Sequence, residues 1–171
     1  MNKAILLIIG AAVVLFGGIL LLAREDTDPM EELSASFGAD ESEVISESGI
    51  HWHPELTILI KRQKQEIPAD VGIGVQYRDN RWFDPMMQMT DIHTHDNSGT
   101  LHWEVMSGPV KKGHVKLGAF FEIWGKPFNT TQLFEYKNGE SGTLTMLVNG
   151  QPNTAFETYV VKDGDKIEIR Y

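Results

Sequence analysis

Two short stretches of this sequence are rich in histidine. Residues 51–53 read HWH, and residues 93–104 read HTHDNSGTLHWE. Together they hold five of the six histidines in the chain, namely His51, His53, His93, His95 and His102. Imidazole nitrogen binds Zn(II), Cu(II), Ni(II) and Fe(II), and histidine is the commonest metal ligand among the side chains. The two stretches therefore predict a metal site.

The second stretch indicates a β-hairpin. The turn-forming residues DNSG at 96–99 separate two short runs of β-forming residues. A four-residue loop would pair His95 with Thr100 and place His93 opposite His102. Directly opposed residues have Cβ atoms about 4.5–5.5 Å apart. The same count places Asp91 opposite Glu104.

Side chains alternate between the two faces of a strand. One face of the hairpin is therefore expected to carry His93, His95, His102 and Glu104. The other face is expected to bury Ile92, Leu101 and Trp103. Three imidazoles on one side can meet around one ion at ~2.0–2.1 Å from each nitrogen.

The HWH stretch follows the same alternation. His51 and His53 face one way, and Trp52 faces the other. If this strand lies beside the hairpin, five imidazoles line one surface; if it does not, the site has three histidines and one carboxylate. Asp96 has two interpretations, because it can bond a histidine ring N–H as an outer partner of the ligands or cap the turn.

The metal is expected to be copper or zinc. The chain has no cysteine, so thiolate sites and disulfides are excluded. Four methionines lie near the hairpin, namely Met86, Met87, Met89 and Met106. Thioethers favour Cu(I), which places copper ahead of zinc, although core filling is the commoner use of methionine. Without a metal, the same histidines would form a polar surface that gains positive charge below pH ~6.5.

The N-terminal segment predicts a membrane anchor. Residues 4–23 are apolar or small and carry no charge, and a helix of that length spans the ~30 Å hydrocarbon core. Acidic residues follow the segment but do not precede it, so residues 1–3 are expected in the cytoplasm and the rest outside. Cleavage as a signal peptide is the alternative, but the run is long and lacks a small-x-small site.

Residues 24–49 carry nine carboxylates and one arginine, which predicts a solvated, flexible tether. The remaining residues, 50–171, contain 15 acidic and 13 basic side chains. Their net charge is thus near −2, and no basic stripe indicates binding to nucleic acid. The expected partners are the membrane, through a single span, and a membrane protein complex.

Residues 50–171 predict an α+β domain, mainly antiparallel β with one short helix. Leu117, Phe120, Phe121 and Trp124 form the apolar stripe of that helix, which Gly125 ends. Strands are expected on either side of turns at 63–64, 149–150 and 163–164. The ending DGDKIEIRY is similar to the closing strand of β-grasp domains.

Several segments, including HWHPELTILI, IPADVGI, IHTHDNSGTLHWE, KLGAFFEIWGKPF and DGDKIEIRY, carry a wider resemblance. They resemble a group of small exported or membrane-anchored domains of archaea and bacteria, across nearly all of residues 50–171. The pattern H-T-H-D-x-S-G-x-x-H-x-E is its most specific part. The resemblance implies a prokaryotic extracytoplasmic domain and assigns no activity.

The preferred interpretation is a membrane-anchored, extracytoplasmic protein that binds copper or zinc, rather than an enzyme. A zinc-dependent hydrolase or lyase is the second interpretation, with a three-histidine zinc activating water and Glu104 or Asp96 accepting the proton. An accessory subunit of a membrane complex is the third. The motifs of nucleotide-binding loops and of serine hydrolases do not occur in the sequence.

Overall fold

The computed structural model describes residues 41–139 and 142–171. The expected anchor at 4–23 and most of the expected tether lie outside these residues. Within the two described ranges, no helix combines the length and apolar character needed to cross a bilayer. The described chain is mainly antiparallel β with a short helix, as the α+β prediction requires.

A five-stranded sheet forms one half of the molecule, in the order β14-β13-β15-β3-β4. Its strands are β3 (Glu55–Ile60), β4 (Gln63–Gln65), β13 (Thr145–Val148), β14 (Gln151–Asn153) and β15 (Lys166–Arg170). The last strand, β15, lies at the centre, parallel to β3 and antiparallel to β13. Alternating apolar residues of these central strands enter the core.

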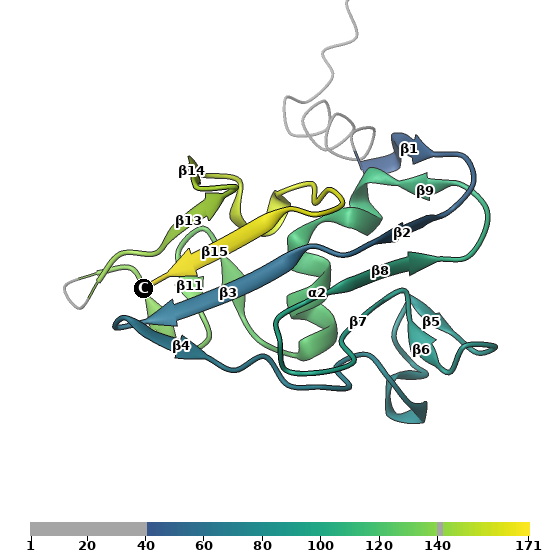
Figure 1. Ribbon diagram of the computed structural model, residues 1–171, viewed down its shortest axis with the longest axis horizontal. Coiled ribbons are helices and arrows are strands. Elements are labelled where there is room, and N and C mark those ends of the chain that lie inside the picture. Colours follow the sequence, from purple (N-terminus) through teal and green to yellow (C-terminus); the bar gives the residue numbers. More distant parts are fainter. Residues whose placement is uncertain (1–40, 140–141) are drawn as a thin grey trace, which may run out of the picture.

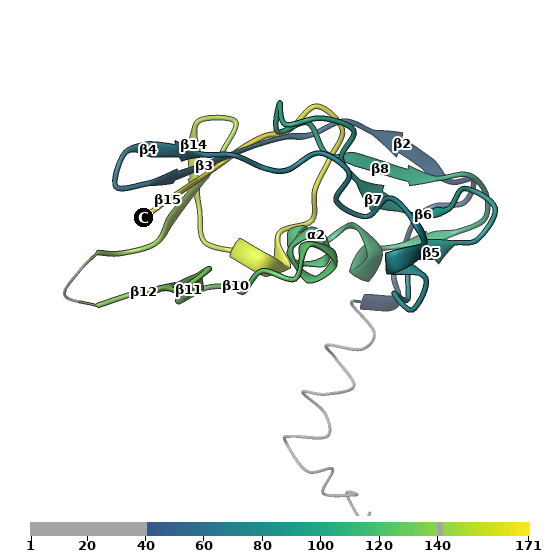
Figure 2. The ribbon, with the colours of Figure 1, turned by 90° about the horizontal axis from the view of Figure 1, so that it is seen from below.

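The helix α2 (Leu117–Trp124) covers the inner side of the sheets, as Figures 1 and 2 show. Its buried residues include Leu117, Phe120 and Phe121. Gly125 ends the helix with a left-handed φ of 70°, a conformation that glycine adopts without steric cost. The predicted helix and its stop are both confirmed.

A second sheet carries the histidines, in the order β2-β8-β7. Its strands are β2 (Ile50–Trp52), β7 (Ile92–His93) and β8 (His102–Val105), all antiparallel to their neighbours. Figure 1 shows β2 running on into β3, so the two sheets share one long chain segment. The register set by β2 and β8 continues to an isolated bridge between Glu55 and Thr100.

Shorter elements complete the fold. The paired strands are β1 (Val44–Ser46) with β9 (Val110–Lys111), β5 (Phe83–Asp84) with β6 (Met89–Thr90), and the set β10 (Phe128–Asn129), β11 (Gln132–Leu133) and β12 (Tyr136–Lys137). Three 3-10 turns are η1 (Val75–Tyr77), η2 (Lys112–Val115) and η3 (Phe156–Thr158). Since β1 lies within the range expected to be tether, ordered structure begins before residue 50.

Two local predictions are wrong in detail. The first hairpin turns at Lys61 and Arg62, both with positive φ (51° and 67°), and not at residues 63–64. The segment before the Asp163–Gly164 turn forms the 3-10 turn η3 and an isolated bridge rather than a strand. By contrast, the Asn149–Gly150 turn joins β13 to β14 as predicted.

Candidate metal centre

Three histidines form a row across the second sheet. His93 on β7 lies opposite His102 on β8, as the hairpin count predicts. On the other side of β8, Trp52 pairs with Trp103. The backbone N–H of Leu101 donates to the Pro54 carbonyl at 2.9 Å, in the same register. This register places His53 opposite His102, so the row reads His53, His102, His93.

A second row lies two residues further along the strands. His51 pairs with Glu104, and the Glu104 backbone N–H donates to the Asp91 carbonyl at 2.7 Å. Because every second residue of a strand points to the same side, both rows share one face. We call this surface the histidine face, defined by His51, His53, Asp91, His93, His95, His102 and Glu104.

The opposite side of the same strands is apolar and closed. Ile92, Leu101 and Trp103 are fully buried in the core. The Trp103 Nε1–H donates to the His114 carbonyl at 3.2 Å, which satisfies the one polar atom of that side chain. Burial of this side fixes which way the strands face, and therefore holds the histidines on the opposite side.

His93 is the most constrained ligand candidate. Its side chain is buried, and its Nδ1 lies 3.0 Å from the Thr90 carbonyl. A neutral ring that donates its Nδ1–H to this carbonyl keeps a lone pair on Nε2, which is the arrangement of metal-bound histidines. The Nε2 atom lies 3.3 Å from Nε2 of His95.

The inner set of ligand candidates is His93, His95 and His102. Ligand nitrogens of this set all lie within 4.8 Å of one another. Two nitrogens bound tetrahedrally at ~2.0–2.1 Å from zinc are separated by about 3.3–3.4 Å. The 3.3 Å between His93 and His95 already meets this value, so small rotations of His102 would complete a three-nitrogen site.

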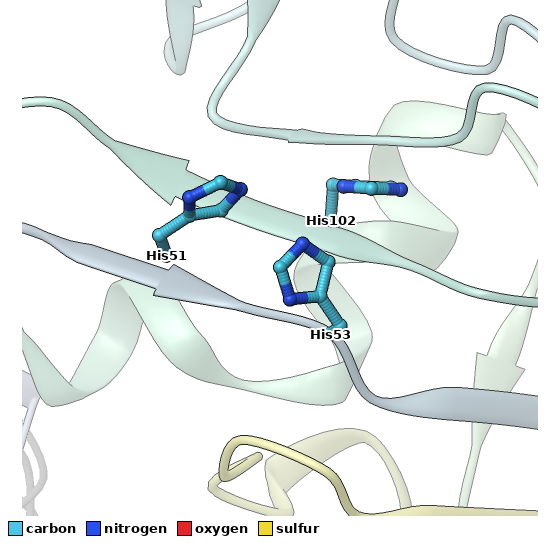
Figure 3. A group of neighbouring side chains, drawn as sticks. All are labelled: His51, His53 and His102. Carbon is cyan, nitrogen blue, oxygen red and sulfur yellow. The ribbon is translucent and has the colours of Figure 1, made fainter.

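The outer set is His51, His53 and His102, whose ligand nitrogens also lie within 4.8 Å of one another. Figure 3 shows the three rings on the same side of β2 and β8. The ring centroids of His53 and His102 are 4.8 Å apart, and those of His51 and His53 are 4.6 Å apart. The five imidazoles therefore line one surface.

The backbone at Gly72 packs closely against His93. Gly72 has a φ of 83°, and its carbonyl accepts the Thr90 backbone N–H at 2.8 Å. A Cβ at Gly72 would stand 2.6 Å from the Ile92 carbonyl oxygen and 3.1 Å from the His93 Cβ. Only glycine lets this segment lie against β7.

Two imidazoles of the histidine face, those of His93 and His102, have lowered pKa values. Burial and the neighbouring imidazoles lower the pKa of His102 to about 4. Burial also lowers the pKa of His93, while the Thr90 carbonyl and nearby carboxylates oppose the shift. Since a metal binds only the unprotonated nitrogen, these rings need lose no proton at neutral pH.

The two carboxylates expected at the site, Glu104 and Asp96, lie at different distances from the imidazoles. A Glu104 carboxylate oxygen lies 3.9 Å from Nε2 of His93, near enough to offset the charge of an ion there. Asp96 is exposed and accepts the Ser98 backbone N–H at 2.8 Å, so in this structure it caps the turn. Hydrogen bonds from Ser98 lower the pKa of Asp96. The ring N–H of His93 is paired with the Thr90 carbonyl instead.

The sixth histidine stands beside the face. Nε2 of His114 lies 2.9 Å from Oδ2 of Asp91 but makes no hydrogen bond. Its ring stacks on Trp82 with centroids 6.0 Å apart. Sequence reasoning paired Asp91 with Glu104 but omitted Asp91 from the site, and nothing in the local pattern points to His114.

The four methionines near the hairpin do not fill the core as that alternative expected. Met86 is 92% exposed and Met106 is 63% exposed, while Met87 and Met89 are half-buried. Met106 lines an open hollow of about 360 Å³ together with His51 and Glu104. A thioether is therefore available at one end of the histidine face.

No family model matches this chain, and comparison with curated proteins and with solved structures gives no match. The case for function rests on the geometry of the histidine face.

Proposed function

We propose that this protein binds one ion of Cu(II) or Zn(II) through the imidazoles of the histidine face. The observation that carries the proposal is the inner set, in which three ligand nitrogens lie within 4.8 Å of one another. The buried ring of His93 is held by the Thr90 carbonyl with Nε2 directed toward His95. Such outer hydrogen bonding is typical of metal-bound histidine.

The types of the candidate ligands favour copper or zinc. The candidate ligands are imidazoles with one carboxylate, Glu104, close by. Neutral imidazole suits copper and zinc, whereas calcium and magnesium require mainly oxygen ligands. Met106 at the edge of the face would add a soft ligand for reduced copper.

We further propose that this domain works outside the cytoplasm as a membrane-anchored module. The support is the apolar run at 4–23 followed by acidic residues, which together fit a single span with its N-terminus inside. The fold is consistent with a β-grasp-like domain, because its first hairpin and last strand meet at the sheet centre beside one helix. The resemblance to small exported prokaryotic domains points the same way.

Binding is favoured over catalysis by the surroundings of the face. A zinc hydrolase needs a cleft in which the substrate meets the ion. The hollow beside the face is open, and it is lined by His51, Glu104 and Met106 rather than by the inner set. A role as an accessory subunit would be distinguished by copurification with a membrane complex.

The test is metal stoichiometry. The full chain, purified without a histidine tag, is dialysed against Zn(II) or Cu(II) and assayed by elemental analysis and by competition with a chelator. We expect one tightly bound equivalent. The triple variant His93→Ala/His95→Ala/His102→Ala should lose it, whereas the control His114→Ala should keep it because His114 belongs to neither ligand set. A triple variant that retains one tight equivalent would refute the proposal.

A further inference from the structure

The histidine face contains two ligand sets that overlap at one residue. The inner set is His93, His95 and His102, and the outer set is His51, His53 and His102. His102 belongs to both because β8 is the central strand, between β2 and β7. Its ring centroid lies 4.6 Å from that of His95 and 4.8 Å from that of His53. An ion bound to His102 is thus within a short displacement of either set.

The two sets differ in exposure and in support. His51 and His53 are exposed, and Figure 3 shows their rings on the same side of the strands as His102. In the inner set, His95 is also exposed, but His93 is buried and its ring is held by the Thr90 carbonyl. A ligand held in place loses less rotational freedom on binding than an exposed side chain that must be ordered. The inner set should therefore bind more tightly, and the outer set should exchange more readily with solvent.

The shared ligand His102 favours one ion at a time. Glu104 lies 3.9 Å from Nε2 of His93, and Asp96 is close enough to His95 and His102 for their charges to interact. Asp91, the neighbour of Glu104 on the face, has its Oδ2 2.9 Å from His114. A neutral imidazole offers one lone pair, so His102 can bind one ion at a time, and two divalent ions at such short range would also repel each other. The sets are better suited to successive occupation than to simultaneous occupation.

We propose that the outer set receives and releases the ion, and that the inner set holds it, with His102 as the common ligand. This inference rests on the proposed function, since it assigns separate roles within the same metal site. In the transfer, bonds from the ion to His51 and His53 break as bonds to His93 and His95 form. The bond to His102 persists, so the charge of the ion and its number of imidazole ligands do not change.

The experiment measures stoichiometry and exchange rates on the full chain with Zn(II). The outer variant is His51→Gln/His53→Gln, the inner variant is His93→Gln/His95→Gln, and His114→Gln is the control for losing a histidine outside both sets. Loading is followed by stopped-flow with a fluorescent zinc chelator as donor, and release with EDTA as acceptor. Circular dichroism checks that each variant is folded; the outer variant changes only exposed side chains.

We expect the wild type to bind one equivalent. The outer variant should keep that equivalent with nearly unchanged affinity, while loading and release both slow by about tenfold or more. The inner variant should bind zinc about 100-fold more weakly than the wild type and exchange it rapidly. Two tight equivalents in the wild type, or unchanged rates in the outer variant, would overturn this inference while leaving metal binding intact. A wild type that binds no zinc or copper would refute the proposed function itself, and this inference with it.

Discussion

Substituting alanine for Gly72 tests whether the close backbone approach beside β7 seats His93. The new Cβ would stand 2.3 Å from the Thr90 hydroxyl and 2.6 Å from the Ile92 carbonyl oxygen. Gly108 offers a matched control, because its φ of 84° nearly equals the 83° of Gly72 and no atom beyond its chain neighbours lies within 4 Å of a Cβ built there. The two variants share the conformational penalty and differ in the collision.

The magnitudes follow from these two contributions. A left-handed φ costs a non-glycine residue about 1–2 kcal/mol, so Gly108→Ala should lower the free energy of unfolding by about that amount. Gly72→Ala adds overpacking of about 1–3 kcal/mol, for a total of about 2–5 kcal/mol. With an m-value of about 2 kcal/mol/M, the urea midpoint should fall by roughly 0.5–1 M and roughly 1–2.5 M respectively.

The collision also reaches the metal site, because the Gly72 Cβ would stand 3.1 Å from the Cβ of His93. Zinc affinity of Gly72→Ala should therefore fall by about 10–100-fold, as when an outer partner of a metal ligand is lost. Gly108→Ala should retain wild-type affinity. The assays are urea unfolding followed by tryptophan fluorescence and zinc competition with a chelator. Equal stabilities and equal affinities in the two variants would refute the reasoning.

Three further predictions concern the same face and its support. Lowering the pH from about 6.5 to about 4.5 should destabilise the metal-free protein. In this range His102 becomes protonated in the unfolded chain, while burial keeps its pKa in the folded protein at about 4. The urea midpoint should therefore decrease with pH, and His102→Gln should make that decrease smaller. Trp103→Ala, at a fully buried position, should cost about 3–5 kcal/mol in chemical unfolding, against a change within about 0.5 kcal/mol for the exposed Val75→Ala. His114→Ala should lower the free energy of unfolding by about 1 kcal/mol through loss of its contacts with Asp91 and Trp82. If this variant also lost its bound zinc, His114 would be a ligand and the assignment of the two sets would be wrong.

The local geometry of the site was predictable because strand alternation has a period of two. Placing Asp96–Gly99 at the turn was enough to set His93 opposite His102, which the structure confirms. The loop itself is longer than predicted, because the pairing of β7 with β8 ends at His93 and His102. Thr94 exchanges backbone hydrogen bonds with Asp70 and Val71 instead, and the hairpin pattern contains no information about that distant segment.

Long-range features of the site were less accessible. The adjacency of β2 to β8 was left open at the sequence level, and the structure brings His51 and His53 to the hairpin. The Thr90 carbonyl that holds His93 is a backbone group, so no residue type signals it. The helix was predictable from its apolar stripe and its glycine stop, whereas the central position of β15 depends on pairing with a strand far away in the sequence.

The parallel pairing of β15 with β3 has a consequence for how the molecule assembles. Near that junction, the backbone N–H of His53 donates at 2.8 Å to Asp163, which is 110 residues away. Contacts between such distant parts of a chain form slowly, because a large loop must close before they contribute. During synthesis, the HWH strand would leave the ribosome long before its support in the sheet exists. Ions that meet the nascent chain would then encounter loose imidazoles, and the shaped face would form only after β15 has docked.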